Sequence, residues 1–183
     1  MINRREWISA AALAAIAAAD RADAAAHGVS RPPRGAKVPA FTFVYECRAT
    51  IAPPLDFGQT LEGHRRVIPI TGGTFEGPRM RGEIVANGAD WNLSRNDGAS
   101  TVDAAYYLKT DDQVLIRIVN RGIGAPVAAA APVASEVFFM YTHPAFEAPT
   151  GRYDWLNRGM FIGTLGARRG AKNEVLIRVF ELT

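Results

Sequence analysis

The stretch that decides the fold is RMRGEIVANGADWNLSRNDGASTVDAAYYLKTDDQVLIRIVN, residues 79–120. Short runs rich in β-branched and aromatic residues alternate there with Asn87-Gly88, Asn96-Asp97-Gly98 and Asp111-Asp112. Asn-Gly and Asp-Gly pairs accept positive φ and are strong hairpin signals. The stretch therefore predicts a series of strands joined by tight turns, over residues 79–87, 89–95, 100–109 and 113–120.

The same pattern extends to both sides of this stretch, with further strands expected over 41–50, 65–71, 135–142, 158–165 and 174–182. Residues 144–157 contain two prolines and a glycine, so they predict at most a helical turn near Tyr153 to Asn157. About nine antiparallel strands and no long helix predict an all-β closed barrel or a sandwich. A barrel of eight or more strands can hold one small ligand inside.

Composition excludes several classes of protein. The chain has 183 residues, of which 48% are hydrophobic and 21% charged, so it has enough apolar side chains for one folded domain. Cys47 is the only cysteine, which excludes an internal disulfide and a cysteine-rich zinc site. No apolar run is long enough to span a bilayer, so no stable membrane insertion is expected. The net charge of +3 is small for the whole chain and does not indicate a nucleic-acid partner.

The N-terminus has the organisation of an export signal. Arg4-Arg5 is followed by an aromatic and an aliphatic residue, a weakly apolar alanine-rich stretch and small residues at 22–26. This pattern resembles a twin-arginine signal. We therefore expect a signal peptide over 1–27, a linker over 28–40, a single barrel domain over 41–183, the twin-arginine export machinery as a partner and a periplasmic location. The alternative is an alanine-rich helix packed on the domain.

An ordered series of motifs in residues 41–183 resembles a known family. The motifs are Gly63-His64-Arg65-Arg66 with Gly72-Gly73-Thr74-Phe75, then Asn87-Gly88-Ala89-Asp90-Trp91, Asp97-Gly98, Val102-Asp103-Ala104, Asn120-Arg121-Gly122, Pro144-Ala145-Phe146-Glu147 and Tyr153-Asp154-Trp155-Leu156-Asn157. They resemble domain-of-unknown-function family 3237. The resemblance implies an antiparallel, lipocalin-like (calycin-type) barrel and an association with phenolic, polyketide or cyclic-ether compounds. Ala105 stands where the family often has an arginine, which removes an anion-binding group from that strand.

Three residues are candidates for acid–base catalysis. Asp90 could lie at the mouth of the barrel, where a dry environment raises the pKa of a carboxyl group and makes it a base near neutral pH. Asp103 and Tyr107 share one face of a strand, so they could form an acid–base pair inside the barrel, with Tyr107 as the hydroxyl donor. The alternatives are that Asp90 bonds to the Asn87-Gly88 turn and that Asp103 lies on the outer face.

Seven residues are candidates for ligand binding. Arg66 and Arg117 lie in otherwise apolar strands and could hold a phenolate or carboxylate, or pair with a neighbouring acid. Aromatic rings could line the pocket or pack in the core, and an amide could orient a ligand carbonyl or cap a turn. These side chains are Trp91, Phe139, Tyr141, Trp155 and Asn157.

No cofactor or metal is predicted. The sequence contains no Walker loop, no G-x-G-x-x-G and no G-x-S-x-G motif, and its three histidines lack the spacing of a metal site. The first hypothesis is therefore an exported, cofactor-independent isomerase or C–O lyase or cyclase that acts by proton transfer on a small aromatic or polyketide-like molecule. The second is a non-catalytic periplasmic carrier of a hydrophobic ligand. The third is a structural or oligomer-forming barrel with a filled interior. A homo-oligomer is compatible with each of them.

Overall fold

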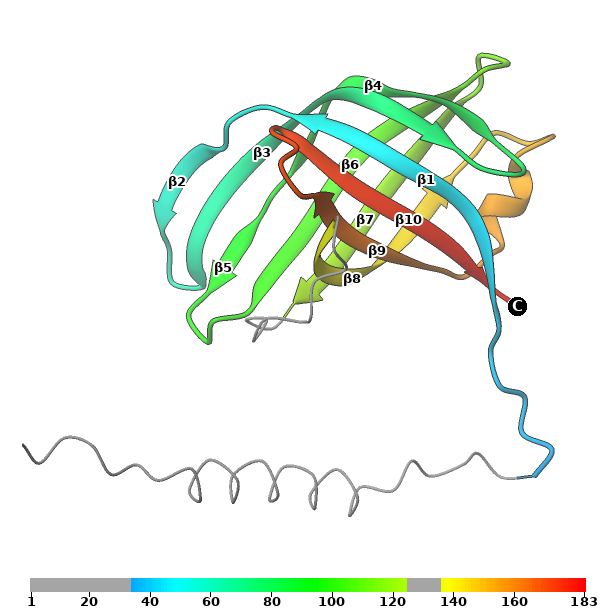
Figure 1. Cartoon of the computed structure of the whole chain (residues 1–183), viewed down its shortest axis with the longest axis horizontal. Coiled ribbons are helices and arrows are strands. Elements are labelled where there is room, and N and C mark those ends of the chain that lie inside the picture. Colours follow the sequence, from blue (N-terminus) through cyan, green and yellow to red (C-terminus); the bar gives the residue numbers. More distant parts are fainter. Residues whose placement is uncertain (1–33, 125–135) are drawn as a thin grey trace, which may run out of the picture. The chain divides into compact units, whose positions relative to one another are not determined.

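Ten antiparallel strands form the described part of the chain, which comprises residues 34–124 and 136–183 of a computed structural model (Figure 1). The predicted signal peptide and the first part of the predicted linker lie outside the described residues. Among the described residues, no helix is long and apolar enough to cross a bilayer. The strands are β1 (Phe41–Ile51), β2 (Leu55–Gln59), β3 (Gly63–Glu76), β4 (Arg81–Asp90), β5 (Leu93–Arg95), β6 (Ser100–Thr110), β7 (Leu115–Gly124), β8 (Glu136–Glu147), β9 (Phe161–Arg168) and β10 (Glu174–Leu182).

Eight of these strands close into a barrel, in the order β1-β10-β9-β8-β7-β6-β4-β3. The barrel closes between β1 and β3, where Cys47 pairs with Phe75 and Ala49 pairs with Gly73. Strands β2 and β5 are additions: β2 pairs with β3, and β5 pairs with β3 and β6. The prediction of an all-β antiparallel barrel is confirmed. Closure pairs every barrel strand on both sides, which removes the exposed edges that promote aggregation.

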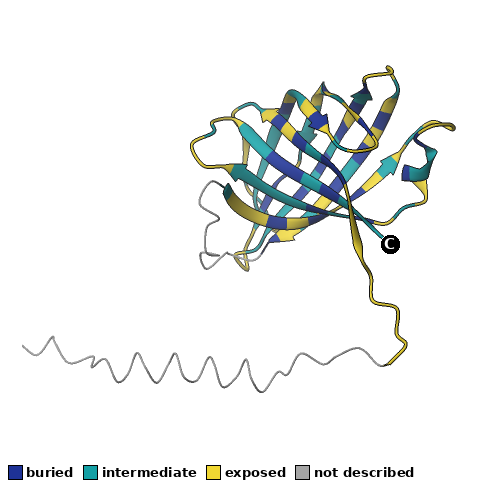
Figure 2. Cartoon of the chain, turned by 45° about the vertical axis from the view of Figure 1, so that its right-hand side comes forward, coloured by how far each residue is buried: buried dark blue, intermediate teal, exposed yellow. Residues whose placement is uncertain are grey.

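Buried apolar side chains lie in the barrel interior where β6 ends and β7 begins, here called the packed end. Leu108, Ile116 and Ile118 face inward there and have no exposed surface. Figure 2 shows the buried positions of the strands in dark blue. A single turn of 3₁₀ helix, η1 (Asp154–Asn157), follows β8, and its Leu156 is also buried. The helical turn expected near Tyr153 to Asn157 is therefore present. The opposite end of the barrel lies near β5, which pairs with the start of β6.

The predicted hairpin at Asn87-Gly88 is wrong. β4 continues through both residues, and its pairing with β6 shifts register between Val85 and Ala89. Asn87 has a φ of 77°, so the left-handed residue forms a bulge instead of a turn. The bulge changes the direction of the strand and brings Asp90 into register with Ile68 of β3 and Ala104 of β6.

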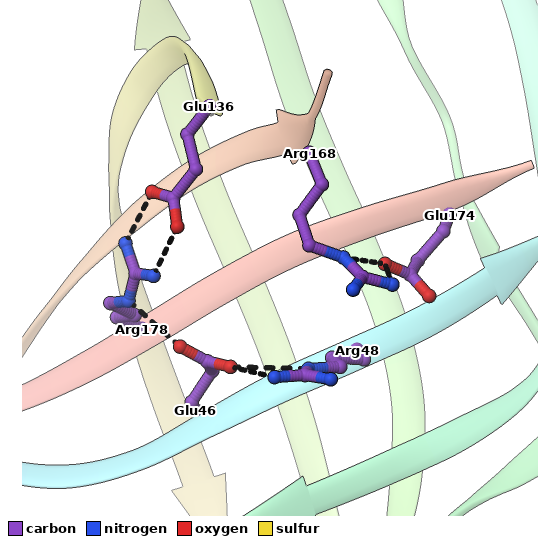
Figure 3. A network of polar contacts seen from close by, with 6 residues as sticks. All are labelled: Glu46, Arg48, Glu136, Arg168, Glu174 and Arg178. Carbon is purple, nitrogen blue, oxygen red and sulfur yellow. Dashed lines mark hydrogen bonds and ion pairs between the residues drawn. The ribbon is translucent and has the colours of Figure 1, made fainter. Parts of the chain in front are cut away.

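Charged side chains connect four strands on the outside of the barrel (Figure 3). The Arg178 guanidinium of β10 is 2.7 Å from Glu136 of β8 and 2.9 Å from Glu46 of β1. Glu46 also accepts a bond from Arg48, while Arg168 of β9 pairs with Glu174 of β10. The hydrogen bonds that Arg178 donates to Glu136 hold the pKa of this carboxyl group below its usual value. The network fixes the β8-β9-β10-β1 wall of the barrel from outside.

Cys47 lies in the core, as its apolar surroundings in the sequence predict. Its side chain is fully buried, and this desolvation raises the pKa of the thiol to about 12. A protonated, buried thiol is unreactive toward oxidants and disulfides. The single cysteine is therefore a packing residue of β1.

Candidate functional site

Asp90 is the carboxylate that the fold directs into the barrel. Its neighbours in register are Ile68 and the buried Ala104, both of which face inward. Its Oδ1 accepts a hydrogen bond of 2.9 Å from the backbone N–H of Asp103. The last residue of β4 thus places a partly buried carboxylate on the inner wall near the β5 end.

Arg66 of β3 lies two residues along the strand from Ile68, the partner of Asp90, and is held by uncharged partners. Its Nη2 donates to Oδ1 of Asn92 at 2.8 Å and to Oγ of Ser94 at 3.3 Å. The amide of Asn92 is fixed in turn, because its Nδ2 donates to the Thr101 carbonyl. Within the described ranges Arg66 forms no ion pair, and its buried Nε has no hydrogen-bond partner. Arg66 therefore keeps a positive charge and an unused donor at this end of the barrel.

The environment of Asp90 changes its acidity. Desolvation is the largest effect and raises its pKa from 3.8 to about 6. The Asp103 backbone N–H, the Asn92 amide and the Arg66 guanidinium each lower the pKa, while the Asp103 carboxylate raises it further. A carboxyl group with this pKa is mostly ionised at pH 7 and still takes up a proton readily, as a general base requires.

This pKa makes stability depend on pH in a defined direction. The Asp90 carboxyl group binds its proton more tightly in the folded chain than in the unfolded chain, so protonation stabilises the fold. This stabilisation is complete below about pH 4 and is lost as pH rises through about 6. After allowance for the partial exposure of Asp90, this loss is about 2 kcal/mol between pH 4 and 7. Asp90→Asn should remove it, because the amide does not titrate. Urea denaturation at several pH values measures the difference between the two proteins; parallel curves would contradict the shifted pKa.

The predicted interior pair of Asp103 and Tyr107 does not form. Both residues lie on the outer face of β6, where Asp103 pairs with Arg121 at 3.0 Å and Tyr107 is 48% exposed. The inner face of β6 carries the other set of alternate residues, Val102, Ala104, Tyr106 and Leu108, all of which are buried. Asp103 contributes to the site through its backbone N–H, which bonds to Asp90.

Most of the other predicted ligand-binding residues are exposed or lie on the outer face of the barrel. Arg117 is on the outer face and pairs with Glu147 at 3.3 Å. Trp91 and Tyr141 are 46% and 65% exposed, and Phe139 lies at a register shift in β8. For Arg117 and Tyr141 the position follows from strand alternation, which places their side chains out of phase with the buried residues. Of the ten predicted site residues, the structure brings together Asp90 and Arg66.

Trp155 and Asn157 belong to the packed end of the barrel. The Arg79 guanidinium lies 3.4 Å from the centre of the Trp155 ring and also pairs with Glu181. The Asn157 amide bonds to both the N–H and the carbonyl of Ala148, each at 2.8 Å. These contacts fix the segment around η1.

Sequence reasoning missed the polar side chains that face inward from otherwise apolar strands. Asn120 follows Ile116 and Ile118 in the same phase of β7, and Thr142 follows Met140 in β8. All of these side chains are buried. A polar residue two positions after a buried apolar residue of the same strand is the sequence signal that could have identified these inward side chains. In the described part of the chain, no group of three or more His, Cys, Asp or Glu residues could hold a metal ion.

The comparison with protein families identifies the chain. Residues 39–182 match the family model described as "Protein of unknown function (DUF3237)". The chain belongs to this family. Among the DUF3237 relatives is a "UPF0311 protein" of Rhodopseudomonas palustris (strain TIE-1), which is 31% identical over 129 residues, or 67% of this chain and 84% of the relative. The resemblance seen in the motifs is thereby confirmed.

Solved structures of similar proteins share the barrel. A protein with unknown function from Clostridium acetobutylicum ATCC 824 is 25% identical, with a TM-score of 0.71 over 81% of this chain and 100% of that one. A β-barrel-like protein from Acinetobacter baumannii AYE is 29% identical, with a TM-score of 0.70 over 82% and 99%. A protein described as an enzyme from Penicillium herquei is 23% identical, with a TM-score of 0.63 over 84% and 98%; this likeness concerns the fold.

Proposed function

We propose that this DUF3237 protein is a cofactor-independent enzyme that transfers a proton within a small, mostly apolar, oxygen-bearing molecule bound inside the barrel. The observation that carries the proposal is the Asp90 carboxylate on the inner wall, with its pKa raised to about 6 by desolvation and with Arg66 beside it. A base of matched pKa next to a fixed cation is a recurrent arrangement for proton abstraction. That a fold neighbour is described as an enzyme is compatible with this proposal.

The proposed reaction uses the two charged groups in different roles. The Asp90 carboxylate takes a proton from the ligand, and the electron pair of the broken bond moves onto a ligand oxygen. The Arg66 guanidinium stabilises that oxyanion, for which its unpartnered Nε–H is a suitable donor. Return of the proton to another ligand atom gives an isomer. If the electron pair instead expels a ring oxygen, a C–O bond opens and the proton passes to that oxygen.

The inner wall near Asp90 favours an apolar ligand body. Ile68 and Ile70 face inward beside the end of β4, and Leu165 faces inward from β9, as their register with other inward residues shows. Partial exposure of Ile68 and Leu165 indicates that solvent reaches this half of the interior. Small aromatic, phenolic or polyketide-like molecules combine an apolar body with oxygen atoms, and they are the class that we propose.

A binding protein without catalysis is the second candidate. It is favoured by the bond between Asp90 Oδ1 and the Asp103 backbone, which gives the carboxylate a structural task at the end of β4. A thermal-shift screen of phenols and cyclic ethers, with each stabilising compound recovered and analysed, distinguishes the two candidates. Recovery of an altered compound supports the enzyme, and recovery of an unchanged compound supports the carrier.

We further propose that the protein is exported by the twin-arginine route to the periplasm. The support is the sequence of residues 1–27, with Arg4-Arg5 ahead of a weakly apolar segment. The double variant Arg4→Lys/Arg5→Lys should keep the chain in the cytoplasm, since this route reads the paired arginines. Cell fractionation and N-terminal sequencing measure the outcome. Equal export of both proteins would contradict the proposal.

A further inference from the structure

Large apolar side chains are exposed at the end of the barrel where β2 and β5 lie (Figure 1). On the side of β2 and β3 they are Leu55, Phe57 and Leu61, of which Phe57 is 73% and Leu61 99% exposed. Hydrogen bonds fix the turn that carries Leu61: Gln59 donates to Asn96 Oδ1, and Asn96 donates to the Leu61 carbonyl, each at 3.0 Å. The fold therefore holds this leucine in solvent.

A second apolar cluster lies at the same end, where β7 ends and β8 begins. Ile123 and Tyr141 are partners in register, and both are more than half exposed. The exposed Phe138 ring lies 4.9 Å from the Tyr141 ring, measured between centroids. In the barrel order β8 is four strands from β3 in either direction, so the two clusters lie on opposite sides of this end. We call the two clusters together the apolar rim.

The β9–β10 turn adds positive charge at the same end of the barrel. Its Arg169 and Lys172 are exposed, and neither forms an ion pair with another described residue. The carboxylates of the β2–β3 and β5–β6 turns, Glu62 and Asp97, are each paired with an arginine. The turns at this end therefore carry a surplus of positive charge beside exposed apolar surface.

We propose that the apolar rim and the basic β9–β10 turn dock the protein reversibly on an anionic phospholipid surface. Apolar side chains that protrude from a fold enter the interfacial layer of a bilayer, and neighbouring Arg and Lys side chains attract the anionic headgroups. A flat lipid surface can contact both sides of the barrel end at once. A second copy bound through the same end would bring its own Arg169 and Lys172 to this surface, and like charges disfavour that contact. The docking goes beyond the proposed function and does not depend on it.

Co-sedimentation of the full chain with lipid vesicles tests the docking. With vesicles of equal parts phosphatidylcholine and phosphatidylglycerol, Leu61→Asp should lower the affinity at least about tenfold, because it removes one buried apolar contact and adds a repelled charge. Arg169→Gln/Lys172→Gln should lower it about tenfold and abolish most of the preference over pure phosphatidylcholine. Met160→Asp is the matched control, since Met160 is 73% exposed at the packed end, and it should change the affinity less than about twofold. No binding, or equal losses for Leu61→Asp and Met160→Asp, would overturn the proposal.

A fluorescent label gives a second readout, which reports the orientation of the docked protein. Cys47 is buried, so Leu61→Cys and Met160→Cys each provide one accessible thiol for an environment-sensitive fluorophore. The same vesicles should shift the emission of the label at position 61 to shorter wavelength and leave that at position 160 unchanged. The reason is that only the apolar rim enters the bilayer interface. A shift at position 160 as large as that at position 61 would overturn the proposal.

Sedimentation velocity without lipid tests a second copy as the occupant of the apolar rim. We expect the unmodified protein and Leu61→Asp to sediment alike. A dimer that Leu61→Asp dissociates would make the rim a contact between copies and overturn the proposal. Asp90→Asn should keep the vesicle affinity of the unmodified protein, because Asp90 faces the interior, so docking and catalysis are tested separately.

Discussion

Replacement of Asp90 by asparagine should lower kcat at least about 100-fold while ligand affinity stays within about twofold, because the amide keeps the shape of the carboxyl group and loses its basicity. The residual activity of the variant should lack the pH dependence of the unmodified protein, since asparagine does not titrate. Turnover of any compound found in the screen, followed by chromatography and mass spectrometry, measures the effect.

The pH profile of the unmodified protein tests the same assignment independently. Asp90 must be ionised to accept a proton, so kcat/KM should rise with pH through about 6 and level off above it. Below this value activity should fall about tenfold for each pH unit. Asp111→Asn is the matched control, because Asp111 is exposed and pairs with Arg81 at the packed end of the barrel. A kcat for Asp90→Asn within threefold of that of the unmodified protein would contradict the assignment.

Gly73→Ala should destabilise the fold more than any other change considered for this chain. Gly73 pairs with Ala49 where β1 and β3 close the barrel, and its φ is 131°. A Cβ at this position would lie 2.1 Å from the Arg48 carbonyl oxygen. The backbone strain and the steric conflict together should cost about 3–5 kcal/mol. Urea denaturation of the two proteins measures this loss.

The change Gly72→Ala separates the backbone strain from the steric conflict. Gly72 has a similar φ of 145°, but an added Cβ there would meet no atom closer than 3.7 Å. Gly72→Ala should therefore show only the strain, about 1–2 kcal/mol. Equal losses for Gly72→Ala and Gly73→Ala would mean that close contact between β1 and β3 does not constrain this position.

The strands were predictable, but the phase of β6 was not. Val102 and Leu108 place apolar residues at the ends of one face, while Asp103 and Lys109 place charged residues at the ends of the other. Each face also carries one alanine and one tyrosine at the centre of the strand, so apolar content there does not distinguish them. The sequence interpretation therefore left both faces open for Asp103 and Tyr107. Pairing with β4 and β7 decides the phase, and a single strand contains no information on that pairing.

The polar half of the site depends on contacts between distant residues. Asp90 and Arg66 were predicted individually, from their unusual positions in β-type segments. Their common environment arises because Asn92 bonds to Arg66 across 26 residues and because the Asn87 bulge redirects β4. Short-range patterns identify an Asn-Gly pair as turn-forming, and tertiary pairing converts it into a bulge. Strand β2 was missed because its five residues include a glycine and little apolar alternation.

Hydrogen exchange into a bound ligand tests the central claim most directly. The full chain and its Asp90→Asn variant are incubated in D₂O with each stabilising phenol or cyclic ether, and the recovered compound is analysed by mass spectrometry. The account predicts deuterium at a carbon position of at least one compound with the unmodified protein, and binding without incorporation for Asp90→Asn. Recovery of every bound compound unlabelled and unaltered from the unmodified protein would contradict it.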